Sequence, residues 1–498
     1  MRLPRFFRSI PKISFGRRAK NEAPQSSSGP QRRWDAAGTN RINESHWAGA
    51  NLTDTPISND QATNLDRIRV RSQYEIANNA MLAGVVETWV SDMLQKVGPH
   101  LRVKSDIDNQ FAQDLMEIWQ AWWEAPDLRG RRSGVDMLRT AFRGYFPAGE
   151  YIFQIVTDDQ STLRIKGKLF KTKIVGIAPR RLKHPYGAVG SAGQNIALGI
   201  ESDSFGRPIR YFFEDERSFG AYAFGSGEMV PVPARDIIHD FVALEPDQIR
   251  GVPWLAFNLG TIGELRDFDQ QVLDAARLVA SQTLFIYSDH ALIEPVNIDP
   301  GEQVEIDRNT MTVLPPGYKP FSLPATQPSN NYKEFRHERM RELGRFVGMP
   351  LLHIMLDSRD HNFATARLDR GMYRSQLISH QDRIEFSTLD RLMWAVYREA
   401  RLLNVIGDMP DDFIHEWIWP SLPEGDAKTS AQATTESLNN RTMSRTEAIN
   451  MRGRDPEDVF REIAEENAMM ETYGITEMPT PAPQPQPEGT DDDEQAND

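Results

Sequence analysis

Apolar residues recur at steps of three and four along much of the chain, the spacing that places them on one face of an α-helix. In the N-terminal part this spacing predicts helices over residues 65–94, 108–123 and 134–143, with Asn78-Asn79 as a weak point in the first. Between residues 150 and 243 the apolar runs become short and β-rich, separated by Gly, Pro, Asp and Ser, which predicts a mainly antiparallel sheet. The predicted strands are Tyr151–Val156, Lys173–Ile177, Ile209–Phe213 and Asp236–Val242.

The central part of the chain predicts two helices on either side of a segment rich in Pro and Gly. The first begins near Pro253, a residue that the first turn of a helix tolerates, and continues to about Leu284, a length of about 45 Å. The segment 289–329 is too long for a simple loop, so we expect a small subdomain there. The second helix covers residues 331–347 and ends at Gly348-Met349-Pro350.

A polar loop and a long helix follow. The loop consists of Asp357, Ser358, Arg359, Asp360, His361 and Asn362. From about Phe363 to Leu403 the chain contains no Pro and only Gly371, and apolar residues that include Phe386 and Met393 alternate steps of three and four. An unbroken helix of this length measures about 60 Å. A charged helical region is expected over residues 427–473.

Composition narrows the class of protein. The 498 residues are enough for roughly two to four structural units, and 39 % hydrophobic residues supply real cores. The net charge of −14 has the wrong sign for a protein that coats nucleic acid. The absence of Cys excludes disulfides, thiol nucleophiles and thiolate metal sites. No stretch of about 18 apolar residues predicts a membrane span, and the N-terminus does not have the pattern of a secretory signal.

The two ends of the chain differ in charge from the rest. Residues 1–33 carry nine Lys or Arg and one Glu, whereas residues 477–498 carry seven acidic residues and no basic residue. Such compositions are typical of solvated, disordered tails. The basic arm has a second interpretation, a docking segment for an acidic protein or nucleic acid, and the sequence leaves that open.

Few residues point to catalysis or metal binding. Without Cys, a metal site would need His and carboxylates from separate segments, so a polar loop is the simpler interpretation of the clusters present. No Gly-x-Gly-x-x-Gly follows a strand and no Gly-Lys-Ser/Thr loop occurs, so nucleotide binding has no support. Trp119, Trp122 and Trp123 could stack bases, but their helical spacing favours a buried core. The ligand-type clusters are His239-Asp240, His353, Asp357, Asp360 and His361.

Four motifs and a weaker fifth follow one another between residues 65 and 405. Together they resemble the portal proteins of tailed bacteriophages, specifically the lambda-like portal family. The segments 289–330 and 405–498 match that family poorly. The motifs are Arg71–Thr88; Trp119, Trp122-Trp123 and Asp136 with Gly149-Glu150; Gly199–Asp203 with Gly206–Ile209; Ile238-His239 with Gln248–Trp254; and Asn362–Arg367.

The resemblance implies an α+β, portal-type fold with an α/β wing, a helical stem, a small clip subdomain, a long helix and a helical crown. The boundaries are inferred from the order of the motifs. They give a basic flexible arm (1–60), the wing (61–250), a stem helix (251–288), the clip (289–329), a second stem helix (330–349), the tunnel loop with the long helix (350–404), C-terminal wing or crown helices (405–474) and a disordered acidic tail (475–498).

The resemblance also implies a function. Portal proteins form a homo-oligomeric ring, usually of twelve copies, at one capsid vertex of the virion, around a channel for double-stranded DNA during packaging and ejection. The expected partners are double-stranded DNA without sequence specificity, terminase, the major capsid protein and head-completion or adaptor proteins. No enzymatic activity, cofactor, metal or membrane is expected.

The expected site residues lie in the loop and on the first stem helix. At the narrowest part of the channel, Arg359 and His361 would touch phosphates, while Asp357 and Asp360 would limit the local positive charge. An acidic stem would repel a duplex and let it slide. Two alternatives stay open, an α-helical adaptor that forms no closed ring and a hydrolase that uses His239 and His361. The expected channel face of the stem consists of Glu264, Asp267, Asp269 and Asp274.

Overall fold

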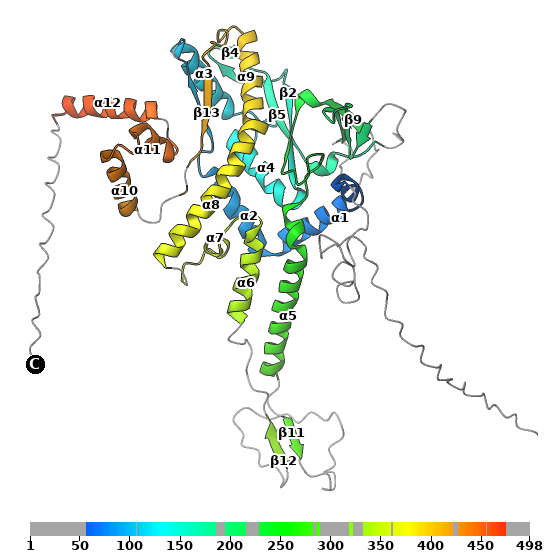
Figure 1. Ribbon diagram of the computed structural model, residues 1–498. Helices are drawn as coiled ribbons and strands as arrows, with labels where there is room; N and C mark the ends of the chain where they lie inside the picture. The colour runs from blue at the N-terminus through cyan, green and yellow to red at the C-terminus, as the bar shows by residue number, and fades with distance from the viewer. Residues whose placement is uncertain are drawn as a thin grey trace, which may run out of the picture. The chain divides into compact units, whose positions relative to one another are not determined.

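The described part of the chain mixes helices with small antiparallel sheets, so the predicted α+β class is confirmed (Figure 1). Most of the expected arm (1–60), most of the expected clip (289–329) and all of the expected tail (475–498) lie outside the described residues. The computed structural model describes residues 56–105, 107–185, 195–215, 229–281, 285–288, 318–321, 332–359, 362–420, 422, 427–454 and 456–474.

The first predicted helix is broken at the expected place. α1 (Ile57–Asn78) and α2 (Ala80–Leu94) are separated by Asn79, whose backbone is extended, with φ of −118°. The Asn79 side chain accepts hydrogen bonds from the N–H groups of Met81 and Leu82, at 3.1 and 3.4 Å. It therefore caps α2 and fixes the break between the two helices.

The next two predicted helices are confirmed as α3 (Asn109–Trp123) and α4 (Gly134–Ala148). Trp119, Trp122 and Trp123 of α3 are buried, with at most 9 % of any of them exposed. The indole N–H of Trp122 donates to the carbonyl of Thr172 at 2.8 Å. The tryptophans therefore belong to the core, as their spacing predicts.

The β-rich stretch forms two main sheets, with their strands antiparallel as predicted. One sheet has the strand order β10–β2–β5 and the other has the order β6–β7–β8–β9. The strands of the first are β2 (Glu150–Thr157), β5 (Thr172–Ile177) and β10 (Ile237–Phe241); those of the second are β6 (Asn195–Ala197), β7 (Ile200–Ser202), β8 (Pro208–Glu214) and β9 (Met229–Pro233). A small hairpin, β3 (Arg164–Ile165) and β4 (Lys168–Leu169), and two short 3-10 turns, Pro179–Arg181 and Ala234–Asp236, complete the region.

One strand pair joins distant parts of the chain, and the sequence pattern does not predict it. β1 (His100–Lys104) pairs antiparallel with β13 (Ile414–Ile418), which places Arg102 opposite Glu416 in an ion pair of 3.0 Å. The two residues are 314 positions apart, so no local pattern indicates the pairing. The segment 405–474, expected to be helical, thus contributes a strand.

The two predicted stem helices pack against each other. A 3-10 segment, η5 (Trp254–Asn258), leads into α5 (Leu259–Ser281), and α6 (Tyr332–Arg345) lies beside it (Figure 1). The ring of Phe268 lies 6.0 Å from that of Tyr332. Residues 285–288 form a strand, β11, that pairs with β12 (Tyr318–Phe321), so the helix does not continue to residue 288 as expected.

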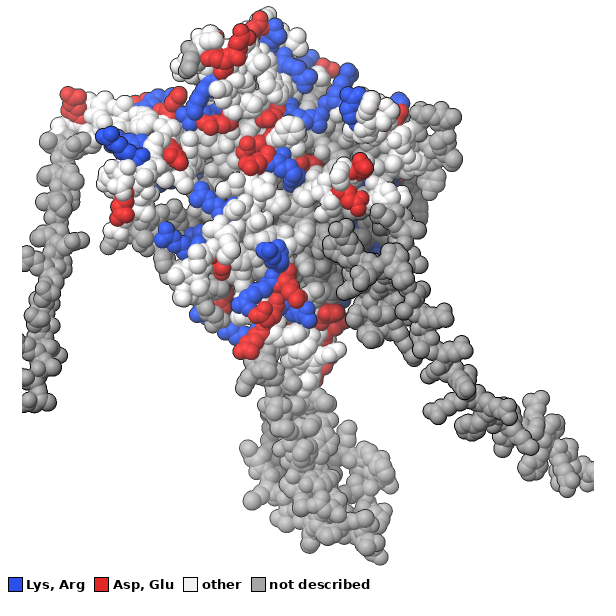
Figure 2. Space-filling model, viewed as in Figure 1, with Lys and Arg blue, Asp and Glu red and all other residues white. Residues whose placement is uncertain are grey.

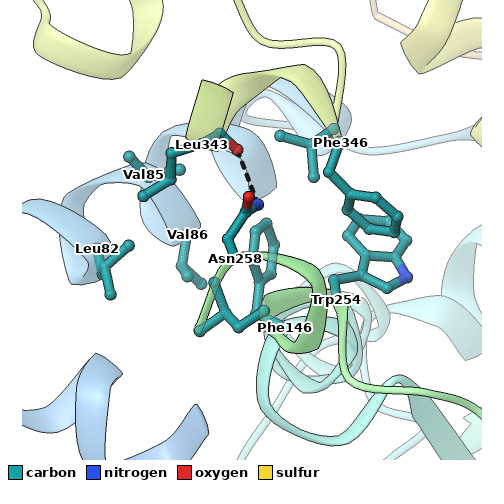
Figure 3. Close-up of a pocket in the computed structure, with 10 residues that line it drawn as sticks. Leu82, Val85, Val86, Phe146, Trp254, Asn258, Leu343 and Phe346 are labelled. Atoms are coloured by element: carbon teal, nitrogen blue, oxygen red, sulfur yellow. Dashed lines mark hydrogen bonds between the residues drawn. The ribbon is translucent and has the colours of Figure 1, made fainter. Parts of the chain in front are cut away.

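The stem begins at a tightly packed joint. Side chains from η5, α2, α4 and α6 close around a void of about 10 Å³, and the Asn258 amide donates to the Leu343 carbonyl at 3.3 Å (Figure 3). Such a void has room for about one water molecule, so the joint is a packed core and not a ligand pocket. The labelled residues around it include Leu82, Val85, Val86, Phe146, Trp254 and Phe346.

The long helix is nearly continuous but contains a π-helical segment. α8 (Phe363–Ile384) passes through this segment, Glu385–Leu389, into α9 (Asp390–Leu402). α9 buries the apolar face that the spacing predicts. Phe386, which the same spacing places on that face, is 81 % exposed. A π-helical turn holds about one residue more than an α-helical turn, which shifts the faces of the helix on either side of it.

Three helices occupy the charged C-terminal region, as predicted: α10 (Ala427–Asn439), α11 (Arg445–Met451) and α12 (Pro456–Thr472). Asn450 of α11 accepts a hydrogen bond from Arg102 of β1 at 3.4 Å. Gly453 follows with φ of 71° and lies against Pro420, where a Cβ atom would come within 2.5 Å of the proline Cα. α11 is therefore attached to the rest of the chain, whereas most side chains of α12 are exposed.

Candidate functional site

Residues from two of the sequence motifs meet at one buried carboxylate. Glu150, at the start of β2, has no solvent exposure and accepts hydrogen bonds from Arg250 at 2.6 Å and from Arg69 of α1 at 2.8 Å. Its other oxygen lies 3.1 Å from the His239 ring of β10 and accepts from the Gly251 N–H at 2.7 Å. We call Glu150, Arg69, Arg250 and His239 the Glu150 cluster.

The Glu150 cluster connects segments that are distant in sequence. Arg250 also donates to the carbonyls of Pro179, Leu182 and Leu198, at 3.1, 3.1 and 2.9 Å. Burial alone would raise the pKa of a carboxyl group, but the guanidinium groups of Arg250 and Arg69 hold the pKa of Glu150 well below its ordinary value. Glu150 is therefore ionised, and it joins α1, the three-stranded sheet and the turn before β7.

The same cluster explains the role of His239. Its side chain is 3 % exposed and lies between Glu150 and the ring of Tyr211, whose centroid is 5.6 Å away. A general base must reach its substrate, so this geometry gives His239 a structural role and does not support the hydrolase alternative. Among the described residues, no group of three or more His, Asp or Glu side chains could hold a metal ion. No described helix has the length and apolar character needed to cross a membrane.

A second buried cluster fastens the long helix to the same sheet. Asp240 of β10 bonds to the Tyr145 hydroxyl and to Arg383 of α8, and Arg383 also donates to the Tyr145 hydroxyl at 3.1 Å. The Tyr151 hydroxyl lies 2.7 Å from that of Thr388 in the π-helical segment. Burial and the nearby Asp240 raise the pKa of Tyr145 well above its ordinary value, so this phenol is neutral.

Strand β13 and the residue after it form hydrogen bonds with the long helix at a second place. Asp390 accepts from the indole of Trp417 at 2.8 Å and lies 2.9 Å from His415. The indole of Trp419 donates to Glu385 at 2.6 Å. Burial raises the pKa of Glu385 to about 7, and Asp382 and Asp390 add to this effect against the Trp419 hydrogen bond. The position of the long helix is thus set by contacts with two separate strands.

The polar loop connects α7 (Leu351–Met355) with α8. α7 ends at Leu356 in the left-handed conformation, with φ of 48°. Asp357 accepts from the Arg359 backbone N–H at 3.1 Å and from its guanidinium at 2.5 to 3.0 Å, and this pairing lowers the pKa of Asp357. Asn362 caps α8 by accepting from the Thr365 N–H at 2.8 Å. Ser358 is exposed, and Asp360 and His361 lie outside the described residues.

The four acidic residues expected on one face of α5 do not share a face. Glu264, Asp267 and Asp274 are exposed and lie within about 80° of one another around the helix. Asp269 lies on the other side, where it accepts a hydrogen bond from Tyr332 of α6 at 2.7 Å. The expectation is wrong for Asp269 because each residue turns the helix by about 100°, and two residues after Asp267 the side chain points toward α6.

The charge of α6 is opposite to that of α5. α6 carries five Lys or Arg and three Glu, whereas α5 carries two Arg and four acidic residues. Two of the α6 arginines are paired along the helix, Arg339 with Glu342 at 2.8 Å and Arg341 with Glu338. Both signs of charge are intermixed on the lower part of the described surface (Figure 2). The acidic character of the stem therefore belongs to α5.

Comparison with known proteins gives one family match. Residues 43–381 match the family described as phage portal protein, lambda family, which is more than half of the chain. A probable portal protein of Halomonas phage phiHAP-1 is 24 % identical over 310 residues. That alignment covers 57 % of this chain, and the chain spans 57 % of the length of that relative.

Several solved structures align with most of this chain at low sequence identity. A chain in the neck of an empty GTA particle aligns with a TM-score of 0.46 and 14 % identity, over 82 % of this chain and 97 % of that chain. A chain in the virion of a native gene transfer agent particle gives 0.45 and 13 %, over 79 % and 94 %. A phage portal protein of the HK97 family from Corynebacterium diphtheriae gives 0.32 and 12 %, over 67 % and 96 %.

Proposed function

Because the chain belongs to the lambda family of phage portal proteins, we propose that it forms the portal ring at one vertex of the capsid. The ring surrounds a channel through which double-stranded DNA enters during packaging and leaves during ejection. The observation that carries the proposal is the family match over residues 43–381, which spans the Glu150 cluster, α5, α6 and the loop before α8. The role is structural and not enzymatic.

The subdomains of the proposal follow the described elements. α1–α4 with the two sheets form the wing, α5 and α6 the stem, α8 and α9 the long helix, and α10–α12 the crown. Two boundaries differ from those expected from the sequence. The clip begins before residue 289, because β11 pairs with β12, and β13 belongs to the wing, because it pairs with β1.

The acidic face of α5 is the proposed channel wall. Glu264, Asp267 and Asp274 are exposed on one side of this helix, away from the Tyr332 contact that occupies Asp269. An acidic wall repels phosphates, so a duplex slides past it, whereas a row of unpaired arginines would bind the duplex and release counterions. Two of the five basic residues of α6 are paired with Glu along the helix, which reduces the attraction of this net positive helix for DNA.

The loop from Asp357 to Asn362 is the proposed tunnel loop. Arg359 has an 85 % exposed side chain and is paired with Asp357, so it can meet a passing phosphate while the carboxylate limits the strength of that contact. Asp360 and His361 complete the loop in the sequence. The Asp240 contact of Arg383 fixes α8 in the wing, which holds the loop at the end of an anchored helix.

The proposed partners come from the family and from the charge of the chain. A ring of twelve copies binds double-stranded DNA without sequence specificity, the major capsid protein, terminase during packaging, and head-completion or adaptor proteins afterwards. The basic residues of the segment 1–33 suit a contact with capsid, scaffold or packaged DNA. Deleting that segment is expected to leave rings intact, and loss of rings would show instead that the segment is structural.

Electron microscopy of the purified protein tests the ring, since closed rings with a central hole are expected. Deleting residues 358–361 then tests the channel. We expect the variant to form normal rings but to give particles that package DNA poorly or lose it, measured as the DNA content of purified particles. A protein that is monomeric or dimeric at every salt concentration contradicts the portal assignment. Variant particles that fill and hold DNA normally contradict the role of the loop.

A further inference from the structure

One face of α8 is apolar although it is exposed. Leu368, Met372 and Ile378 are 67, 65 and 44 % exposed. They follow Ala364 at steps that keep them near one side of the helix, opposite the face that buries Tyr373. We call Ala364, Leu368, Met372 and Ile378 the α8 stripe. A helix that is apolar on two sides needs a second partner besides its own core.

α12 carries a matching exposed face. Phe460 and Ile463 are 44 % exposed, and Tyr473, directly after the helix, is 77 % exposed. Met470, between them in the sequence, is half-buried. We call Phe460, Ile463, Met470 and Tyr473 the α12 stripe. From its first to its last residue this stripe measures about 20 Å, and the α8 stripe measures about the same.

The charges beside the two stripes are opposite. α8 carries four Arg and two Asp, and Arg367 and Arg374 along the edge of its stripe have no acidic partner among the described residues. α12 carries six acidic residues and one Arg. Glu466 and Glu471 of α12 have no basic partner in the described part of the chain. Apolar stripes of equal length with opposite flanking charge form a complementary helix pair.

We propose that the α12 stripe of one copy docks on the α8 stripe of the neighbouring copy. The inference rests on the proposed ring and names one of its contacts. Within one chain, α11 is attached at Asn450 to Arg102, and both stripes remain exposed. Each copy offers two different surfaces, one donor and one acceptor, so the contact is head to tail and repeats until the ring closes.

The chain has no Cys, so introduced cysteines report the contact without interference. One set of variants carries a single cysteine on α8 (Leu368→Cys, Met372→Cys or Ile378→Cys) and a second set carries one on α12 (Phe460→Cys, Ile463→Cys or Met470→Cys). All these sites are exposed or half-buried, so the variants should fold. Variants from the two sets are mixed, assembled and oxidised, and the products are separated by size under denaturing conditions.

The expected result is a disulfide-linked dimer in at least one mixture, at about tenfold or more the yield of a control that pairs the α12 variants with Phe205→Cys. Phe205 is 84 % exposed but lies in the turn before β8. A chain that carries both cysteines of the productive pair is expected to give a ladder of linked multimers, because every copy then has a donor and an acceptor.

Two results overturn the inference while leaving the portal function in place. Rings with no linkage above the control would show that another surface covers the α8 stripe. A link that forms within the doubly substituted chain, but not between singly substituted chains, would show that α12 docks on its own α8. Absence of rings from the wild-type protein contradicts the portal proposal instead, and it is read by microscopy before any oxidation.

Discussion

Glu150 in the wing and Asp357 in the loop are both carboxylates paired with Arg, yet their partners lie at very different distances along the sequence. Glu150 has no exposure and is bonded to Arg69 and Arg250, which lie 81 and 100 residues away in the sequence. Asp357 is paired with Arg359, two residues away, whose side chain is 85 % exposed. A buried charge needs a partner, and the partners of Glu150 come from distant segments, so this carboxylate organises the fold. The exposed pair of Asp357 and Arg359 shapes only its own loop.

The largest effect is expected for Glu150, the buried carboxylate of the two. Glu150→Gln removes the negative charge and leaves two arginines buried without compensation, so we expect a loss of about 3–5 kcal/mol in the free energy of unfolding. The measurement is the shift of the denaturant midpoint followed by circular dichroism. Glu87→Gln is the matched control, because it breaks an exposed pair with Arg143 of 2.5 Å and should cost less than about 1 kcal/mol. Similar losses of stability in Glu150→Gln and Glu87→Gln would contradict the difference expected between a buried and an exposed pair.

Glu385 is intermediate between the two carboxylates. Its pKa is raised to about 7, so the folded state holds a proton that the unfolded state releases above about pH 4.5. The resulting stability is present at low pH and is lost as the pH rises toward 7. Glu385→Gln keeps a neutral partner for Trp419, so at pH 8 it should be more stable than the wild type by about 1–2 kcal/mol, allowing for solvent screening of a partly exposed group.

Thermal unfolding of the wild type and the Glu385→Gln variant at pH 5 and pH 8 checks this prediction. The difference between the two proteins should be near zero at pH 5 and should appear at pH 8, and contributions from other titrating groups cancel in the difference. Glu342→Gln on α6 is the control, since its pair with Arg339 is largely exposed. A difference that is independent of pH would show that the Glu385 carboxyl is ionised throughout.

The contact between α5 and α6 should give a smaller effect. Tyr332→Phe removes the 2.7 Å hydrogen bond to Asp269 but keeps the ring beside Phe268, so we expect a loss of about 1 kcal/mol, measured by the same denaturant midpoint. Tyr332→Ala also removes the ring and should cost more. Equal losses in the two variants would mean that the hydroxyl carries the whole contact and that the stacking adds nothing.

The smallest effect is expected for Asp357, the carboxylate in the exposed pair. Asp357→Asn should leave the melting temperature unchanged within error, because its pair with Arg359 is open to solvent and holds only the loop. Hydrogen exchange of the Arg359 N–H should nevertheless become faster, because this N–H donates to the Asp357 carboxylate. A clear drop in melting temperature would show that the pair also supports the packing of α7 or α8.

The sequence predicts those parts of this fold that are encoded by local patterns. Asn79 is recognisable as a break because Asn is a strong capping residue, and the tryptophans of α3 are recognisable as core because they share one helical face. The β1–β13 pair is not predictable in this way, because five-residue strands become stable only when a partner 314 positions away covers them. The sequence places Phe386 on the wrong face because a regular spacing of three and four residues assumes an unbroken α-helix and does not reveal the π-helical segment.

The candidate site is predictable to a similar extent. The loop and the acidic residues of α5 are visible as charge in the sequence, but the Tyr332 partner of Asp269 depends on the packing of two helices. The Glu150 cluster is not apparent as a site in the sequence. Glu150 belongs to one motif, His239 and Arg250 belong to another, and Arg69 lies outside all of them. Only the antiparallel pairing of β2 with β10 brings Glu150 and His239 together. The sequence holds one signal for this cluster, which is residue type. Each of these two motifs contains a charged residue, Glu150 or Arg250, of a type that is rarely buried unless it is paired.

The π-helical segment also has a consequence for how this chain tolerates changes in length. One residue corresponds to about 100° of rotation around a helix, so removing a residue from the segment 385–389 would turn α8 by that amount relative to α9. The buried Tyr373 face would then rotate away from the core, and the exposed face with Leu368 would rotate with it. Insertions and deletions are usually absorbed by surface loops. Here a single-residue difference inside a helix is what aligns the buried faces of its two halves, so this segment should be among the least tolerant of deletion in the molecule.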